Sequence, residues 1–485
     1  MIKFKLVYKV IGSLLFIEAI MLLYCLVVSL YYREDDSLAF IITIAITSLT
    51  ALILKYKGYH AENMMGRRDA YLLVTLTWVV FSLFGALPFT ISGYLGSYTD
   101  AFFETMSGFT TTGATIIDNV EALPHGLLFW RSMTHWIGGL GIVFFTIAVL
   151  PSLVGGSVKV FSAEATGPIK SKMHPRLSTN AKSIWVVYLL LTVGCAVCFY
   201  LSGMGIFDAV NYSMSITATG GFSPHNASTG YFHSAAIDYT SIIFMFLSGA
   251  NFTLLYMTFF KGRALSFFRD AELRFYTCVV LVATVSIMFF LMHDGLYGFG
   301  DALRVSLFQV VSFITTTGVF NADAGKWPHI TWVILSMCMV IGACAGSTSG
   351  GVKCVRGAML ARIIRNEFRR LIHPKAVLPV KIGGNSVAQQ AQVTLLVFIS
   401  LYLGTCLFAY FSFICMGVDS TNSITIALSC ASNVGPTLGL EIGPTMSWSI
   451  LPDAGKWICS VLMLMGRLEF FSVLVLFTRA FWREN

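Results

Sequence analysis

The sequence predicts an all-α integral membrane protein that consists of four repeated units and two extra N-terminal transmembrane helices. Three observations lead to this fold class. Hydrophobic residues make up 56% of the 485 residues and charged residues only 12%, which is far from the composition of a soluble domain. Long stretches without charge alternate with short polar loops. A short phrase that ends on a glycine recurs four times between these stretches.

Ten stretches are apolar enough to cross a bilayer, which takes about 20 residues of α-helix. We expect spans at 10–32, 38–54, 70–99, 132–158, 183–207, 239–260, 275–292, 327–352, 382–418 and 457–478. The first stretch is too long for the core of a signal peptide, so we interpret it as a helix. The first two spans carry no copy of the repeated phrase, which predicts a separate two-helix module at residues 1–68.

The repeated phrase reads TTTGAT at 110–115, TATGGF at 217–222, TTTGVF at 315–320 and SNVGPT at 432–437. Each copy ends its small or hydroxylated run on one glycine: Gly113, Gly220, Gly318 and Gly435. Four copies in one chain predict four equivalent backbone segments that meet on one axis. Backbone carbonyls on such an axis can replace the hydration shell of an alkali cation. A single copy would be an ordinary helix end, but four copies between apolar segments indicate a selectivity filter.

An aspartate opens a short apolar stretch before each phrase, at Asp100, Asp208, Asp301 and Asp419. Aspartate is a good N-cap, because its carboxylate accepts the free N–H groups of the first turn. Each stretch therefore reads as a capped helix of about three turns, too short to span a bilayer. Its C-terminus carries partial negative charge and would face the cation. Each unit is thus predicted as helix, pore helix, filter and helix around one pore, in segments 69–160, 161–265, 266–380 and 381–485.

The second spanning helix of the third unit is abnormal. It contains GACAGSTSGGVK from Gly342 to Lys353, which is not a Walker motif because its lysine does not directly follow the glycine and precede Ser or Thr. Irregular backbone at membrane depth is tolerated only where protein buries it or it lines a water-filled cavity. We therefore expect a broken helix whose loop lies beneath the filter.

Basic residues collect on one side of the predicted membrane. Alternate loops, counted from the N-terminus, carry 26 of the 32 Lys and Arg residues. The positive-inside rule makes this side cytoplasmic, with both termini inside. The outer side carries 15 of the 24 acidic residues, which predicts a vestibule that concentrates cations. The net charge of +8 reflects cytoplasmic loops that face lipid headgroups or a protein partner, and it does not indicate nucleic acid.

Few ionisable side chains lie within the predicted spans. Arg467 lies in the middle of the last span, where charge is costly and points to function. Glu469 projects about 200° away from it on a helix, so a direct pair is not expected. For Glu18 we expect a satisfied interhelical hydrogen bond, and for His135 a packed polar role rather than metal binding. No nucleophile–base set or metal cluster is found in the spans, so the sequence does not predict an enzyme.

Together these motifs resemble a known family. The four filter phrases, HWIGGLG after the first, GSTSGGVK in the third unit and the late GRLEF are similar to the Trk/Ktr/HKT superfamily of potassium uptake proteins. The length and the two extra N-terminal helices are most similar to the bacterial TrkH/TrkG branch.

The resemblance implies a homodimer in the cell inner (plasma) membrane, with one pore per protomer and a cytosolic ring of nucleotide-binding, TrkA-like regulatory subunits. It implies no covalently bound cofactor, and K⁺ as the ion in the filter. The expected filter residues are Thr111, Thr112, Gly113, Ala218, Thr219, Gly220, Thr316, Thr317, Gly318, Asn433, Val434 and Gly435. The expected gating residues are Gly342, Gly346, Ser347, Thr348, Ser349, Gly350, Gly351 and Arg467.

A secondary active K⁺/H⁺ or K⁺/Na⁺ symporter with the same fold is the alternative. Such a transporter needs a carboxylate in the ion pathway to bind the coupling ion. Only Glu18 and Glu469 lie within the predicted spans, and neither belongs to an obvious coupling pair.

Overall fold

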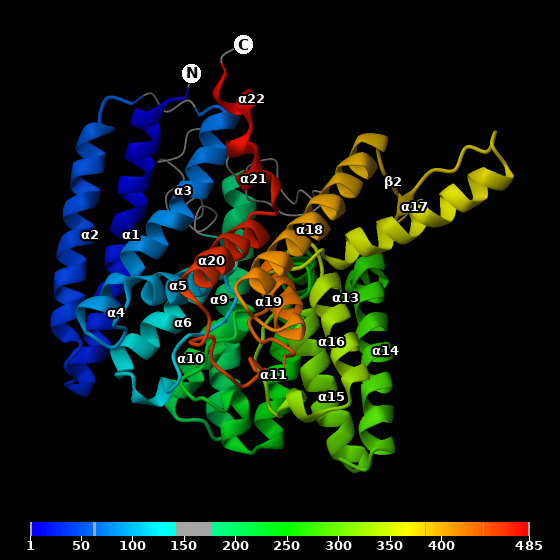
Figure 1. The fold of residues 1–485 in the computed structure, drawn as a ribbon, viewed down its shortest axis with the longest axis horizontal. Coiled ribbons are helices and arrows are strands. Elements are labelled where there is room, and N and C mark those ends of the chain that lie inside the picture. Colours follow the sequence, from blue (N-terminus) through cyan, green and yellow to red (C-terminus); the bar gives the residue numbers. More distant parts are fainter. Residues whose placement is uncertain are drawn as a thin grey trace.

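A computed structural model describes residues 2–61, 65–141, 177–262, 264–383, 385–439 and 441–483. These residues form a helical protein with one short hairpin, β1 (Lys381–Ile382) and β2 (Asn385–Ser386). Six helical segments are long and apolar enough to cross a membrane, or up to eight if each of two bent pairs counts as one span. The predicted class, an all-α membrane protein, is confirmed. The N- and C-termini lie at the same end of the molecule (Figure 1).

The N-terminal module is a hairpin of two long helices. Helices α1 (Phe4–Tyr32) and α2 (Ser37–Lys57) pack along each other, and α1 also packs on α3 and α6. Glu18 of α1 is fully buried, and neither of its carboxylate oxygens has a hydrogen-bond partner among the described residues. The interhelical hydrogen bond expected for Glu18 is therefore wrong, because its nearest neighbours include Gly85, which offers no side-chain donor.

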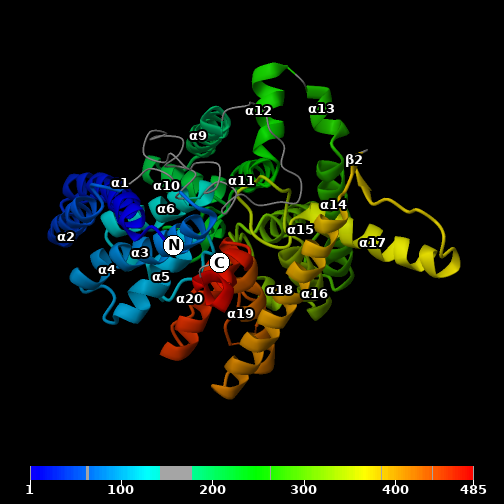
Figure 2. The same ribbon diagram turned by 90° about the horizontal axis from the view of Figure 1, so that it is seen from above.

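Four units follow, each with an outer helix, a short helix and an inner helix. Figure 2 shows that they succeed one another around a common centre in chain order. The outer helices are α3 (Arg67–Gly85), with α4 (Leu87–Ile91), α9 (Leu177–Leu201), α14 (Ala271–His293) and α18 (Gln389–Cys415). The short helices are α5 (Tyr98–Phe109), α10 (Ile206–Thr217), α15 (Phe299–Ile314) and α19 (Ser420–Ser432). The inner helices start with α6 (His125–Leu140), α11 (Ala235–Ser248), α16 (His329–Ile341) and α20 (Asp453–Arg467).

Only one of the four predicted aspartate N-caps is correct. Asp419 caps α19 by accepting the N–H groups of Thr421 and Asn422. Asp100, Asp208 and Asp301 lie in the first turn, and the N-caps are Ser97, Gly205 and Gly298. An acidic residue in the first turn also interacts favourably with the helix dipole. The aspartates therefore mark the starts of these helices, but in three units the N-cap lies three residues before the aspartate.

Within the described residues, the second and fourth inner helices are interrupted as well as the third. Helix α6 ends at Gly141, α16 ends at Gly342, and the second and fourth inner helices bend by 102° into α12 (Phe252–Lys261) and by 111° into α21 (Phe471–Leu474) and η4 (Val475–Phe477). The continuous spans predicted at 239–260 and 457–478 are therefore wrong, whereas the break expected within 327–352 is present. The span predicted at 132–158 runs beyond the described residues after Gly141. Hydropathy alone does not distinguish a straight span from a broken one, since both are apolar.

The remaining elements connect the units. Short 3₁₀ turns η1 (Val120–Ala122), η2 (Ser228–Phe232) and η3 (Ala324–Lys326) precede the first three inner helices. Helix α13 (Ala264–Arg269) leads into α14, and α22 (Arg479–Trp482) lies at the C-terminus. Helix α17 (Cys354–Ile372) follows the broken third inner helix and projects away from the other helices in both views (Figures 1 and 2).

Candidate functional site

The four short helices end in the same turn. Within two residues of each helix end, one residue has a left-handed backbone, with φ between 53° and 57° at Thr111, Thr219, Thr316 and Asn433. The next N–H then returns to a serine carbonyl five residues earlier: Thr112 to Ser107, Gly220 to Ser215, Thr317 to Ser312 and Val434 to Ser429, at 2.9 to 3.0 Å. This pair of features is the Schellman helix end. We call the segments 110–113, 218–221, 315–318 and 432–435 the glycine turns.

The residues at the left-handed positions are unusual for that backbone. Three of them are threonine, and a β-branched side chain with positive φ is a genuine outlier. Such a conformation costs roughly 1–2 kcal/mol per residue relative to the right-handed region. It persists only where the surroundings determine it, and such outliers cluster at functional sites. The strain turns the chain out of the helix direction at the same level in all four units.

The glycine turns touch one another in a closed ring. A Cβ atom built on Gly113 would lie 2.0 Å from the carbonyl oxygen of Gly220. The same construction puts the Cβ of Gly221 at 2.3 Å from the oxygen of Thr317 and that of Gly318 at 2.1 Å from the oxygen of Val434. The ring closes where the Cβ of Gly435 would lie 2.4 Å from the oxygen of Thr112. Four backbone oxygens from four units therefore lie around one axis, and only glycine fits between them.

The second unit is in register one residue later than its phrase suggests. The positive-φ glycines are Gly113, Gly221, Gly318 and Gly435, with φ between 77° and 98°. Gly220 instead shares its hydrogen-bond position with Thr112, Thr317 and Val434. The predicted equivalence of Gly220 with the other three glycines is therefore wrong. Ala218 accordingly corresponds to Thr110, because each is the last residue before the left-handed turn.

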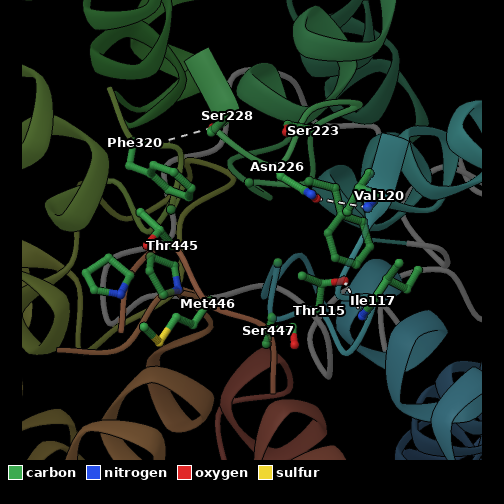
Figure 3. Close-up of a pocket in the computed structure, with 18 of the residues that line it drawn as sticks. Thr115, Ile117, Val120, Ser223, Asn226, Ser228, Phe320, Thr445, Met446 and Ser447 are labelled. Carbon is green, nitrogen blue, oxygen red and sulfur yellow. Dashed lines mark hydrogen bonds between the residues drawn. The ribbon is translucent and has the colours of Figure 1, made fainter. Parts of the chain in front are cut away.

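A cavity opens on one side of the ring. All four positive-φ glycines contribute to its wall, together with polar groups such as Asp118, Ser223 and Asn226. Figure 3 shows side chains from the four units arranged around it. Hydrogen bonds join neighbouring units here: the N–H of Val120 donates to Asn226 and the N–H of Phe320 donates to Ser228. The N–H of Trp448 donates to the carbonyl of Thr115 and joins the fourth unit to the first.

The broken third inner helix lies against the opposite side of the ring. Its loop runs from Gly342 to Lys353, between α16 and α17. The N–H of Gly350 donates to Thr316 at 2.7 Å, and the N–H of Gly351 donates to the carbonyl of Ser432 at 3.0 Å. Thr348 donates to the carbonyl of Thr217 at 3.2 Å. The expected position of the loop, beneath the glycine turns, is what the structure has.

Arg467 connects this loop to the first unit. One guanidinium nitrogen donates to the carbonyl of Thr348 at 3.1 Å and approaches the hydroxyl of Thr111 at 3.4 Å. The other donates to the carbonyls of Gly138 and Gly139, where α6 ends. The carboxylate of Glu469 accepts from Arg356 of α17 at 2.6 Å. A fixed positive charge therefore lies directly beneath the ring.

A family model described as TrkH, cation transport protein, matches residues 36–484. The chain belongs to the TrkH family. The Trk system potassium uptake protein TrkH of Vibrio parahaemolyticus is 36% identical over 99% of this chain and 100% of its own. TrkG of Escherichia coli K12, also a Trk system potassium uptake protein, is 34% identical over 98% of this chain and 97% of its own. The crystal structure of the potassium transporter TrkH from Vibrio parahaemolyticus matches with a TM-score of 0.90 at 34% identity, covering 99% of this chain and 100% of that one.

Membership of the TrkH family confirms the resemblance and excludes the enzyme classes. The structure also shows two residues near the ring, Arg131 and Glu104, that the sequence interpretation did not identify. Arg131 and Glu104 form a buried ion pair at 2.9 Å behind the first glycine turn. Glu104 accepts from the N–H of Ile116, and Arg131 donates to the carbonyl of Ser223 in the second unit. From the sequence alone, both residues fall among the charges expected on the outer side, but their burial next to the repeated phrase gives them a structural role.

Ion pairs also tie neighbouring units of this TrkH-family chain together at their outer ends. Lys456 of α20 contacts Asp100 of α5 at 2.6 Å. Arg304 of α15 contacts Asp238 of α11 at 3.3 Å. Asp100 and Asp238, two of the outer acidic residues, therefore join neighbouring units around the ring. The outer acidic residues do not only line the predicted vestibule.

Proposed function

We propose that the chain conducts potassium ions into the cell through the ring of glycine turns. The closed ring of four carbonyl oxygens carries this proposal, because such oxygens can replace the water around a potassium ion. The filter residues are those expected from the sequence, with Gly221 added as the fourth ring glycine. Membership of the TrkH family and relatives named as potassium uptake proteins support the choice of ion.

The proposal includes the assembly and orientation that the family resemblance implies. The chain forms a homodimer in the inner membrane, with one pore in each protomer and both termini in the cytoplasm. The N-terminal module occupies residues 1–68, and the four units are divided at residues 160, 265 and 380. The excess of basic residues in alternate loops supports this orientation.

The loop from Gly342 to Lys353 acts as a gate. It lies across the inner side of the ring, where it bonds to Thr316, to the carbonyl of Ser432 and, through Arg467, to the first unit. Like charges repel more strongly in a low-dielectric cavity than in water. Arg467 therefore holds the loop in place and repels an ion that has passed the filter. Opening requires that these bonds break together.

A cytosolic regulatory protein moves the gate through α17. Arg362, Arg365, Arg369 and Arg370 are exposed on this projecting helix, where an acidic partner surface can bind them. Arg356 in the first turn of α17 is buried, lies over the ring of Phe398 and pairs with Glu469. Glu469 is two residues from Arg467, so a pull on α17 is transmitted to the arginine that holds the loop.

The backbone after Arg467 is suited to such a movement. Glu469 and Phe470 have positive φ, and the N–H of Phe471 donates to the carbonyl of Glu469 across Phe470, with φ 59° and ψ −51°. This is the rare, strained form of the γ-turn. Strain of this kind is released when the ion pair that holds it is broken, which favours a second conformation.

Reversal potentials of the purified protein in planar bilayers test the proposal. With unequal K⁺ on the two sides, a conducting pore reverses at the Nernst potential of K⁺ at every pH tested. A K⁺/H⁺ or K⁺/Na⁺ symporter would instead shift its reversal potential with the gradient of the second ion. The contacts of the two candidate carboxylates favour the pore: Glu469 is engaged by Arg356, and Glu18 lies beside Gly85 in the N-terminal module's contact with α3.

A further inference from the structure

His135 of the first inner helix joins the backbones of two glycine turns. Its Nδ1 lies 2.8 Å from the carbonyl oxygen of Gly108, in the last turn of α5. Its Nε2 lies 3.1 Å from the backbone nitrogen of Phe222, which directly follows Gly221. The side chain has no exposed surface. Both ring nitrogens are therefore used, one on the first unit and one on the second.

These two partners determine the protonation state of the imidazole. A carbonyl oxygen only accepts, so Nδ1 must carry the hydrogen. A backbone N–H only donates, so Nε2 must be without one. The ring is thus neutral and in a single tautomer, and a rotation by 180° would place Cδ2 and Cε1 against the two partners and lose both hydrogen bonds.

The imidazole also fills space that a side chain occupies in the other units. A Cβ atom on Gly220 would lie 2.4 Å from Cγ of His135 and 2.6 Å from Nδ1. At the equivalent position the other three units have β-branched residues, Thr112, Thr317 and Val434. The φ angle of Gly220 is not in the left-handed region, so its backbone does not require glycine. The ring of His135 is what excludes a side chain there.

We infer that His135 is a positioning residue that sets the geometry of the second glycine turn and with it the cation selectivity. This inference rests on the proposed potassium conduction. In the other units the turn's own side chain, Thr112, Thr317 or Val434, is fully buried at this position. In the second unit the side chain at this position comes from the first unit's inner helix, and it reaches the carbonyl of Gly220, which in turn contacts Gly113. Gly220 in the phrase TATGGF and His135 in the phrase HWIGG therefore form one contact between the two units.

A double-mutant cycle between the two positions tests the inference. The proteins are Gly220→Thr, His135→Ala, the double variant and the wild type, reconstituted in vesicles and assayed for ⁸⁶Rb⁺ uptake with competing Na⁺ or K⁺. We expect Gly220→Thr and His135→Ala each to lower the K⁺/Na⁺ discrimination by roughly tenfold, which corresponds to about 1.4 kcal/mol. The double variant should recover most of this loss, because the threonine then occupies the volume of the imidazole, as in the first and third units.

Two further variants separate the hydrogen bonds. His135→Gln can keep an acceptor for Phe222, and His135→Asn can keep a donor for Gly108. We expect Gln to retain more discrimination than Asn, because Phe222 belongs to the turn that lacks its own side-chain support. Trp136→Phe is the control on the same helix, since it removes a different inter-element hydrogen bond, to Thr192. It should leave the ion ratio unchanged.

The possible failures are distinguishable. A wild-type protein that carries no K⁺ in these vesicles contradicts the proposed function itself. A conducting wild type with additive losses in the double variant, or with an unchanged ion ratio in His135→Ala, contradicts the role of His135. If Gly220→Thr does not assemble, recovery of folded protein by the double variant supports the contact, and no recovery contradicts it.

Discussion

Replacing Gly113 with alanine should disrupt the ring at one of its four contacts. The added Cβ would lie 2.0 Å from the oxygen of Gly220, whereas ordinary contacts begin at 3.4 Å. The two groups must separate by 1.4 Å, the difference between these values, to reach an ordinary contact. The obstacle is backbone, so no side-chain rotation can relieve the clash. The φ angle of 83° at Gly113 adds strain, of roughly 1–2 kcal/mol for a residue with a Cβ.

A displacement of this size exceeds the precision that a binding site needs, which is about 0.5 Å. We therefore expect K⁺/Na⁺ discrimination to fall by at least about tenfold, or about 1.4 kcal/mol. The assay is ⁸⁶Rb⁺ uptake into vesicles, with Na⁺ and K⁺ as competitors over a range of concentrations. Alanine is preferred to serine because it adds the clash without adding a hydroxyl that could itself bind the ion.

Gly404→Ala is the matched control for this substitution. Gly404 lies in α18, and a Cβ there meets nothing within 4 Å. This variant should keep wild-type discrimination and gain a little stability from reduced freedom of the unfolded chain. Unchanged discrimination in a folded Gly113→Ala protein would refute the assignment of this ring as the filter.

Three other predictions concern the gate, the partner and the outer mouth. Arg467→Ala should raise the ion flux of the isolated protein several-fold, because the loop loses its hydrogen bond at Thr348 and the cavity loses its positive charge. A flux equal to that of the wild type would show that the loop is purely structural. Charge reversal at Arg365, Arg369 and Arg370 should abolish co-purification of a nucleotide-binding partner while basal flux persists, and a retained complex would exclude this surface. At the outer mouth, burial lowers the pKa of His225, but hydrogen bonds and charge from Asp208 and Glu121 outweigh it and raise the pKa above its ordinary value. Its protonated form should therefore stabilise the protein fully below the ordinary pKa of about 6.5, and this contribution should be lost as pH rises through the higher folded value; His225→Asn should remove that part of the pH dependence of Tm, and an identical pH profile would contradict it.

The repeated phrase could reveal the four units because each helix end needs the same local chemistry. A left-handed residue, a return to a carbonyl five residues earlier and a glycine recur in every unit, and three of these ends share the TTG or ATG pattern. The serine carbonyls at 107, 215, 312 and 429 were equally regular, and their spacing would have corrected the register of the second unit. Aligning the phrases on their first glycine instead pairs Gly220 with Gly113, Gly318 and Gly435, which is one residue out of register.

The bends in the second and fourth inner helices could not be predicted in the same way. Helix α20 ends at Arg467 within an apolar segment, and Glu469 in the bend pairs with Arg356, which is 113 residues away in the chain. The two roles of His135 likewise come from partners at Gly108 and Phe222. A single sequence holds no record of which distant residues meet, so contacts of this kind become visible only in three dimensions.

The ring of glycine turns is formed within one chain by four segments that differ in sequence. In a pore made of four identical subunits, every substitution is repeated four times around the axis. In the proposed filter, a substitution in one turn changes one of four backbone oxygens and leaves three intact, so we expect its effect on ion binding to be graded. Each unit can also acquire its own support, as the imidazole behind Gly220 illustrates. Because the four units belong to one chain, each quarter of the proposed pore can change in sequence independently of the other three.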